Sequence, residues 1–250
     1  MSKLEKSLQA AMNARIIGSG SETMVLAHGF GGDQSLWDKI LPYLTKHYQV
    51  LLFDWLFSGA VKYPNLYDPL RYSSFDAFAD DLIALMDELH LTSSVFVGHS
   101  MSGMIGCIAS IKRPQLFSGL ILVGASPSIE SGYENWTLSF VKLLVDNNDP
   151  LSVEHYLRCL KSMNPEFVVP LAKIVFCSDE RETLEKVTTP CTIIQTTNDL
   201  VVPESVAHYM QKKIKGETTV EIVKADRHLP QLTAHLELVH VLGRVLGSGI

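Results

Sequence analysis

One short segment, Gly98-His99-Ser100-Met101-Ser102, constrains the fold of this chain more than any other. An apolar run at residues 94–97 precedes it, and a run of small and apolar residues at 103–109 follows it. A strand, a sharp turn with a central serine and then a helix is the arrangement that exposes a serine as a nucleophile. The usual pattern, G-x-S-x-G, ends here in Ser102 rather than glycine. The segment predicts Ser100 as a candidate nucleophile.

A candidate acid and a candidate base follow Ser100 in the order that such a serine requires. The apolar run 191–195 predicts a strand leading to Asp199, and the run 219–223 predicts a strand ending near His228. In that arrangement His228 accepts the Ser100 proton and Asp199 orients the imidazole. Taken alone, Asp199 also fits a turn residue at a strand end, and His228 a surface or capping histidine. Together with Ser100 they predict a catalytic triad.

The loop after an early strand supports the same chemistry. Residues 23–27 predict a buried strand that ends in His28-Gly29-Phe30-Gly31-Gly32. Hydrolases place a loop of this kind beside the nucleophile, where two backbone N–H groups hold the oxyanion. We assign these donors to Phe30 and Met101. His28 and His99 are expected to be structural neighbours of the site rather than bases.

Strand-like and helix-like segments alternate along most of the chain, which predicts a mainly parallel sheet with helices on both faces. With the candidate triad, this predicts an α/β-hydrolase fold. The expected strands are residues 14–18, 23–27, 49–54, 94–97, 120–124, 191–195 and 219–223, and the expected helices are 35–45, 75–89, 101–111, 203–214 and 232–246. We expect one structural domain, with residues 1–126 and 190–250 forming the core and 127–189 a helical lid insertion.

The predicted lid contains helices at residues 136–145, 151–161 and 165–176. Its aromatic side chains Trp136, Phe140 and Phe176 are expected to line a substrate pocket together with Phe30. The alternative for each lid aromatic is that it packs a lid helix onto the core.

Composition excludes several other classes of function. The 250 residues are 46% hydrophobic and carry a formal net charge of −6 with scattered basic residues, so no nucleic-acid partner is expected. We expect no signal peptide. We also expect no membrane span, because no apolar stretch approaches the length of ~20 residues that a span needs. The four cysteines lack metal-like spacing, and we expect no metal, no cofactor and a reduced, intracellular protein.

A dinucleotide-binding unit is the main alternative for the N-terminal part. Gly29-Phe30-Gly31 follows a strand, and a later strand ends near Asp54, as in the G-x-G-x-x-G fingerprint and its ribose-binding acid. Gln34 occupies the place of the third glycine, and this alternative leaves Ser100, Asp199 and His228 unexplained.

Longer strings resemble the plant strigolactone and karrikin receptor family of α/β-hydrolases over nearly the whole chain. They are NARIIGSG at 13–20, LAHGFGGDQS at 26–35 with Trp37, FVGHSMSGMIG at 96–106, ASP at 125–127 and HLPQL at 228–232. The string FDWLFSGA at 53–60 resembles the Dwarf-fourteen-like-two branch most. Between Pro127 and Tyr133 the sequence is shorter than in the family, which indicates a shortened lid.

The resemblance implies slow cleavage of a butenolide signal, with Ser100 attacking the ring carbonyl and the ring held transiently on the enzyme. It also implies a monomer, found in cytoplasm and nucleus, that works with an F-box protein and a repressor target. A lid lacking one helix is expected to leave a more open, wetter pocket and to remove part of that partner surface. Two further hypotheses stay open: a general small-ester hydrolase, and a non-catalytic ligand-binding signalling protein.

Overall fold

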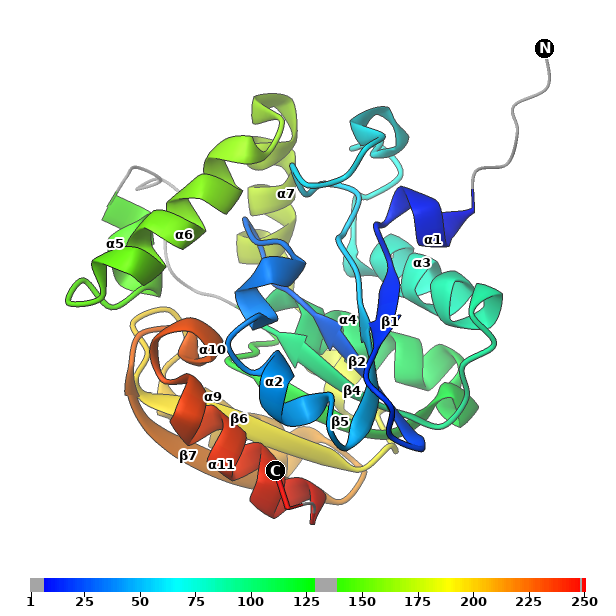
Figure 1. The fold of residues 1–250 in the computed structure, drawn as a ribbon, viewed down its shortest axis with the longest axis vertical. Coiled ribbons are helices and arrows are strands. Elements are labelled where there is room, and N and C mark those ends of the chain that lie inside the picture. The colour runs from blue at the N-terminus through cyan, green and yellow to red at the C-terminus, as the bar shows by residue number, and fades with distance from the viewer. Residues whose placement is uncertain (1–6, 129–138, 248) are drawn as a thin grey trace.

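A seven-stranded sheet forms the centre of the computed structural model, which describes residues 7–128, 139–247 and 249–250 (Figure 1). The strand order is β1-β3-β2-β4-β5-β6-β7; β1 pairs antiparallel with β3, and the other neighbouring pairs are parallel. This confirms the predicted sheet. The strands are β1 (Arg15–Ile17), β2 (Glu22–Ala27), β3 (Tyr48–Leu52), β4 (Ser94–His99), β5 (Phe117–Val123), β6 (Cys191–Asn198) and β7 (Thr218–Asp226).

Both faces of the sheet are covered by helices, because successive side chains of its central strands point to opposite faces and both sets are apolar. Val25 of β2 packs in one cluster with side chains of α3 (Phe75–Glu88), α4 (Met101–Lys112) and α9 (Glu204–Lys213). Its neighbour Met24 packs in a second cluster with η1 (Gln34–Trp37), α2 (Leu41–Leu44) and α11 (His235–Leu246). The carboxyl ends of the strands are thereby left for the loops that carry the site.

Between β5 and β6 the chain leaves the sheet and forms helices. We call three of them the insertion helices: α5 (Ser139–Leu144), α6 (Pro150–Ser162) and α7 (Pro165–Cys177); the short α8 (Arg181–Leu184) follows. In Figure 1 the insertion helices lie together at one end of the sheet. Among the described residues, no helix is long and apolar enough to span a membrane.

Two expected helices are wrong as single elements. Residues 35–45 form η1 and then α2, because Pro42 has no N–H and its ring would clash inside one continuous helix; in the structure it lies in the first turn of α2. Residues 232–246 are divided at Ala234, whose backbone is non-helical (φ −137°, ψ 44°), into α10 (Pro230–Thr233) and α11. The elements α1 (Leu8–Ala11), η2 (Pro64–Leu66), η3 (Pro114–Leu116) and α8 were not expected.

Candidate active site

Ser100 lies at the turn between β4 and α4 with a backbone conformation that few non-glycine residues adopt. Its φ is +55° and its ψ is −123°, and its N–H donates to the carbonyl of Val123 at 2.8 Å. Strand and helix approach each other closely here: a Cβ atom at Gly98 would lie 2.6 Å from the carbonyl oxygen of Ser102. The small residues around Ser100 therefore permit the turn, and the turn presents the hydroxyl to the site.

The structure brings Ser100, His228 and Asp199 together in one hydrogen-bonded line. His228 Nδ1 lies 2.7 Å from Asp199 Oδ2, and His228 Nε2 lies 2.9 Å from Ser100 Oγ. An ionised carboxylate only accepts, so Nδ1–H donates to Asp199 and Nε2 is left to accept the Ser100 proton. His228 and Asp199 are both buried. The geometry is that of a nucleophile, a base and an orienting acid.

The His228 imidazole and two backbone amides favour the ionised form of Asp199. Its Oδ1 accepts from the N–H groups of Val201 (2.8 Å) and Val202 (3.0 Å), and its Oδ2 also accepts from Gln195 Nε2 at 3.1 Å. Burial opposes ionisation, but the His228 imidazole and these amides outweigh it, so the pKa of Asp199 is lowered. The carboxylate is fixed in position and remains charged at neutral pH.

His99 is a buried structural neighbour of His228, as expected. Its Nε2 lies 2.9 Å from the His228 carbonyl oxygen, and the centroids of the two rings are 5.0 Å apart. Burial, together with the nearby His228, lowers the pKa of His99 to about 3. His99 is therefore neutral, and its Nε2–H donates to the backbone that carries His228.

The loop after β2 is joined to the start of α4, next to Ser100, through the carbonyl group of His28. The His28 carbonyl oxygen accepts from Trp55 Nε1 at 3.0 Å and from Ser102 Oγ at 2.5 Å, and Trp55 Nε1 also lies 3.0 Å from Ser102 Oγ. Ser102, where the usual pattern has glycine, thus joins α4 to the loop that contains Phe30. The structure places Phe30 and Met101, the predicted oxyanion donors, on the two segments that these bonds connect.

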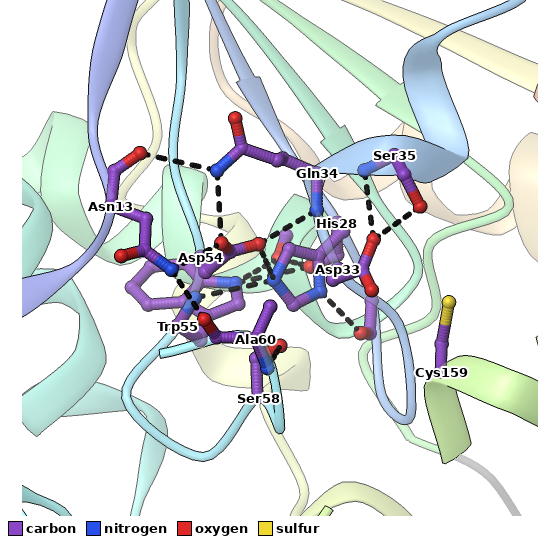
Figure 2. Close-up of polar contacts among 12 residues, drawn as sticks. Asn13, His28, Asp33, Gln34, Ser35, Asp54, Trp55, Ser58, Ala60 and Cys159 are labelled. Carbon is purple, nitrogen blue, oxygen red and sulfur yellow. Dashed lines mark hydrogen bonds and ion pairs between the residues drawn. The ribbon is translucent and has the colours of Figure 1, made fainter. Parts of the chain in front are cut away.

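Figure 2 shows a second set of contacts, which His28 and Gln34 of this loop make with Asp54 and its neighbours. His28 Nε2 accepts the N–H of Trp55 at 3.2 Å, and its pKa is lowered because burial outweighs the attraction of Asp54. The buried Asp54 accepts from the backbone and the side chain of Gln34 (2.8 and 2.9 Å) and from Asn13 Nδ2 at 3.1 Å. Asp54 is therefore an internal acceptor, and the alternative that assigned it to a ribose is wrong.

The space above Ser100 is small and enclosed by apolar side chains. A cavity of about 20 Å³ borders Ser100 and His228 and is closed by Phe30, Leu144, Val175 and Phe176. Its volume is enough for one water molecule. Side chains of α5 and α7 border this cavity. The expected open pocket rests on the short segment after Pro127, most of which lies outside the described residues, so it stays a prediction.

Of the predicted pocket residues, Phe30 and Phe176 border the cavity and pack edge to face, with ring centroids 6.4 Å apart. Trp136 lies outside the described residues, as does most of the short segment after Pro127. Phe140 belongs to α5, but its side chain is also outside the described part.

Three residues near the site were missed by sequence reasoning. Gln195 supports Asp199, Trp55 supports the His28 carbonyl, and Tyr156 of α6 donates its hydroxyl to the Phe30 carbonyl oxygen at 2.8 Å. Gln195 gave one usable signal, a polar residue at the end of a buried strand four positions before the acid. Tyr156 gave none, because its partner is far away in the sequence.

Comparisons with known proteins show the family to which the chain belongs. The family model of the alpha/beta hydrolase fold matches residues 22–158. The chain is 42% identical to the strigolactone esterase RMS3 of Pisum sativum, over 93% of this chain and 95% of that protein. It is 36% identical to the karrikin insensitive 2 receptor IA of Petunia hybrida, over 97% of each.

Solved structures share the fold. A hydrolase from Oleispira antarctica superposes with a TM-score of 0.84 at 26% identity, covering 96% of both chains. An enol-lactonase from Burkholderia xenovorans gives a TM-score of 0.82 at 18% identity over 96% of this chain and 99% of that one, which shows the fold alone. The chain therefore belongs to the α/β-hydrolase family that contains the strigolactone esterases and the karrikin insensitive receptors.

Proposed function

We propose that this protein is a slow serine hydrolase of butenolide signals. The observation that carries the proposal is the line from Ser100 Oγ through His228 to Asp199, with contacts of 2.9 and 2.7 Å, in a chain 42% identical to a strigolactone esterase. A buried, hydrogen-bonded triad beside an apolar cavity suits the attack of a serine on a small apolar ester.

The proposed reaction starts with the transfer of the Ser100 proton to His228 Nε2 as Oγ attacks the butenolide carbonyl. The N–H groups of Phe30 and Met101 stabilise the oxyanion, and Asp199 stabilises the imidazolium. Collapse of the tetrahedral intermediate breaks the bond between the carbonyl carbon and the ring oxygen, which leaves the opened ring as an ester of Ser100. The freed oxygen becomes an aldehyde carbonyl as its carbon expels the enol fragment, and the enol fragment takes the proton from His228. Water then releases the ring fragment from the enzyme, with His228 again acting as base.

The closed cavity supports slow rather than fast turnover. A cavity of about 20 Å³ admits no butenolide, so Phe176 or another enclosing side chain must move before the ring reaches Ser100. Such a movement of the insertion helices would couple ligand binding to a change in the surface that they expose. We propose that an F-box protein and a repressor target bind to this surface. Three further expectations stay predictions: a monomeric state, a cytoplasmic and nuclear location, and membership of the Dwarf-fourteen-like-two branch.

A fluorogenic butenolide and intact-mass spectrometry test the proposal. We expect the wild-type protein to release the fluorophore slowly and to gain the mass of the ring fragment. The variant Ser100→Ala should do neither, because no Oγ is available for attack. Circular dichroism should show that the variant is folded.

Equal fluorophore release by Ser100→Ala would overturn the proposal. Release of simple aryl acetates without any reaction with the butenolide would favour the general small-ester hydrolase. Binding of the butenolide, seen as a shift in thermal unfolding, without adduct or product would favour the non-catalytic binding protein.

A further inference from the structure

Three metal-ligating side chains meet where α6 packs against the loop after β2. Asp33, His155 and Cys159 each offer one ligand atom, and these atoms all lie within 4.8 Å of one another. We propose that Asp33, His155 and Cys159 form a Zn²⁺ site that pins α6 to the loop containing Phe30. This site is separate from the proposed triad, and none of its residues contributes to the hydrolytic steps described above.

The local structure prepares the three side chains for a common ligand. His155 and Cys159 are four residues apart on α6, so they project from the same side of the helix. Asp33 is oriented by the N–H of Ser35, which donates to its Oδ1 at 2.8 Å (Figure 2). Such a bond from a neighbouring group to a ligating carboxylate is usual in metal sites.

The spacing is close to that of a bound cation. In a tetrahedral Zn²⁺ site, ligand atoms about 2.0–2.3 Å from the metal lie about 3.5 Å from one another. Since no two of these atoms are more than 4.8 Å apart, they need to approach by at most about 1.3 Å, which rotations of the side chains provide. Asp33 and His155 are half-buried and Cys159 is buried, so the site is sheltered and still reachable from solvent.

The set of donors favours Zn²⁺ over hard cations. A thiolate and an imidazole are poor ligands for Mg²⁺ or Ca²⁺ and good ligands for Zn²⁺. The Cys159 thiol proton leaves to solvent as the Zn–S bond forms, and the imidazole keeps one proton on Nδ1. The two anionic ligands then neutralise the charge of the metal, and water or the Ser35 hydroxyl, now 2.7 Å from His155 Nε2, completes the coordination.

The position of the site gives the metal a defined effect. Asp33 follows Phe30 by three residues, and Tyr156, next to His155, donates to the Phe30 carbonyl oxygen. A metal bound here would hold α6 closed over the loop that borders the cavity. The bound Zn²⁺ would thus stabilise the packing of α6 against the loop after β2.

Titration of the full-length, reduced and chelator-treated protein with Co²⁺ tests the site without any activity measurement. A bound thiolate gives a sulfur-to-Co²⁺ charge-transfer band, and competition with a chromogenic chelator gives the Zn²⁺ affinity. We expect one metal per chain in the wild type. The variants Cys159→Ser and His155→Gln should lose affinity on the order of 100-fold, and Cys159→Ser should also lose the band.

The matched control is Cys177→Ser, which removes an exposed free thiol at the end of α7. It should bind metal and show the band as the wild type does. Thermal unfolding without metal checks that each variant is folded, and added Zn²⁺ should raise the Tm of the wild type and of Cys177→Ser only. Wild-type affinity in both Cys159→Ser and His155→Gln, or loss of the band in Cys177→Ser, would overturn the site. Because the readouts are spectroscopic and thermal, they are independent of the proposed hydrolysis.

Discussion

At the scale of single residues, Asp199 determines which nitrogen of His228 faces Ser100. Both of its carboxylate oxygens are engaged, Oδ1 by two backbone N–H groups and Oδ2 by His228 and Gln195. The acceptor at Oδ2 keeps the imidazole proton on Nδ1. In the proposed mechanism, the attack by Ser100 therefore depends on a carboxylate that does not contact it.

Replacement of Asp199 by Asn should lower kcat for the fluorogenic butenolide by about 10⁴-fold, because an amide NH₂ facing Nδ1 favours the tautomer in which Nε2 carries the proton. The matched control is Asp226→Asn, which removes an exposed carboxylate at the end of β7 that accepts from Asn198 Nδ2 at 2.6 Å. Steady-state kinetics of the two variants should differ by orders of magnitude. Similar rates would show that Asp199 does not orient His228.

Sequence reasoning located Ser100, Asp199 and His228 because each follows a strongly apolar strand, and parallel strands bring their carboxyl ends to one edge. It did not locate Tyr156 or the cluster of Asp33, His155 and Cys159. Their positions depend on how α6 packs against the loop after β2, and this contact joins segments with no shared local pattern. Local sequence patterns thus predict functional residues that follow strands, but they do not predict contacts that arise when distant segments pack together.

At the scale of secondary structure elements too, features set by the local sequence were predicted and features set by packing were not. The core strands were predicted because they are continuous apolar runs, and their pairing follows from the alternation with helices. The size of the cavity was not predictable, because it depends on the side chains that α5 and α7 place over Ser100. Among the described residues, Leu144 of α5 and Val175 and Phe176 of α7 border a cavity of about 20 Å³ beside Ser100.

Access to Ser100 should therefore be limited by the ring of Phe176 on α7. Replacement of Phe176 by Ala should speed up fluorophore release, since the cavity would extend into the space of the lost ring. Truncation of a buried Phe also costs about 3–5 kcal/mol of stability. The matched control is Phe167→Ala on the same helix, whose equally buried ring packs on Tyr67 with centroids 4.6 Å apart and does not border the cavity.

Pre-steady-state fluorescence and chemical unfolding measure both effects. We expect both variants to be destabilised and only Phe176→Ala to react faster than the wild type. Equal acceleration in the two would mean that general loosening of α7, rather than the Phe176 ring, controls access.

At the scale of the whole molecule, burial of neutral histidines makes stability depend on pH. His28 and His99 are buried, and burial is the main reason that the pKa of each is lowered, for His99 to about 3. In the unfolded chain a histidine titrates near 6.5. Between these values the unfolded state binds a proton that the folded state does not, so stability falls as the pH is lowered.

Urea unfolding between pH 6.5 and 4.5 isolates this effect, because carboxylates with lowered pKa values such as Asp199 contribute mainly below that window. A histidine that stays neutral in the folded state contributes a slope of about 1.4 kcal/mol per pH unit, with full stability retained above about pH 7. The variant His99→Gln keeps an amide donor in place of Nε2–H and has no group that titrates. As the pH decreases, the free energy of unfolding of this variant should therefore fall less steeply than that of the wild type. The two slopes should differ by about 1.4 kcal/mol per pH unit. Equal slopes for the two proteins would show that His99 takes up its proton without unfolding, and that the site containing Ser100 tolerates a buried charge.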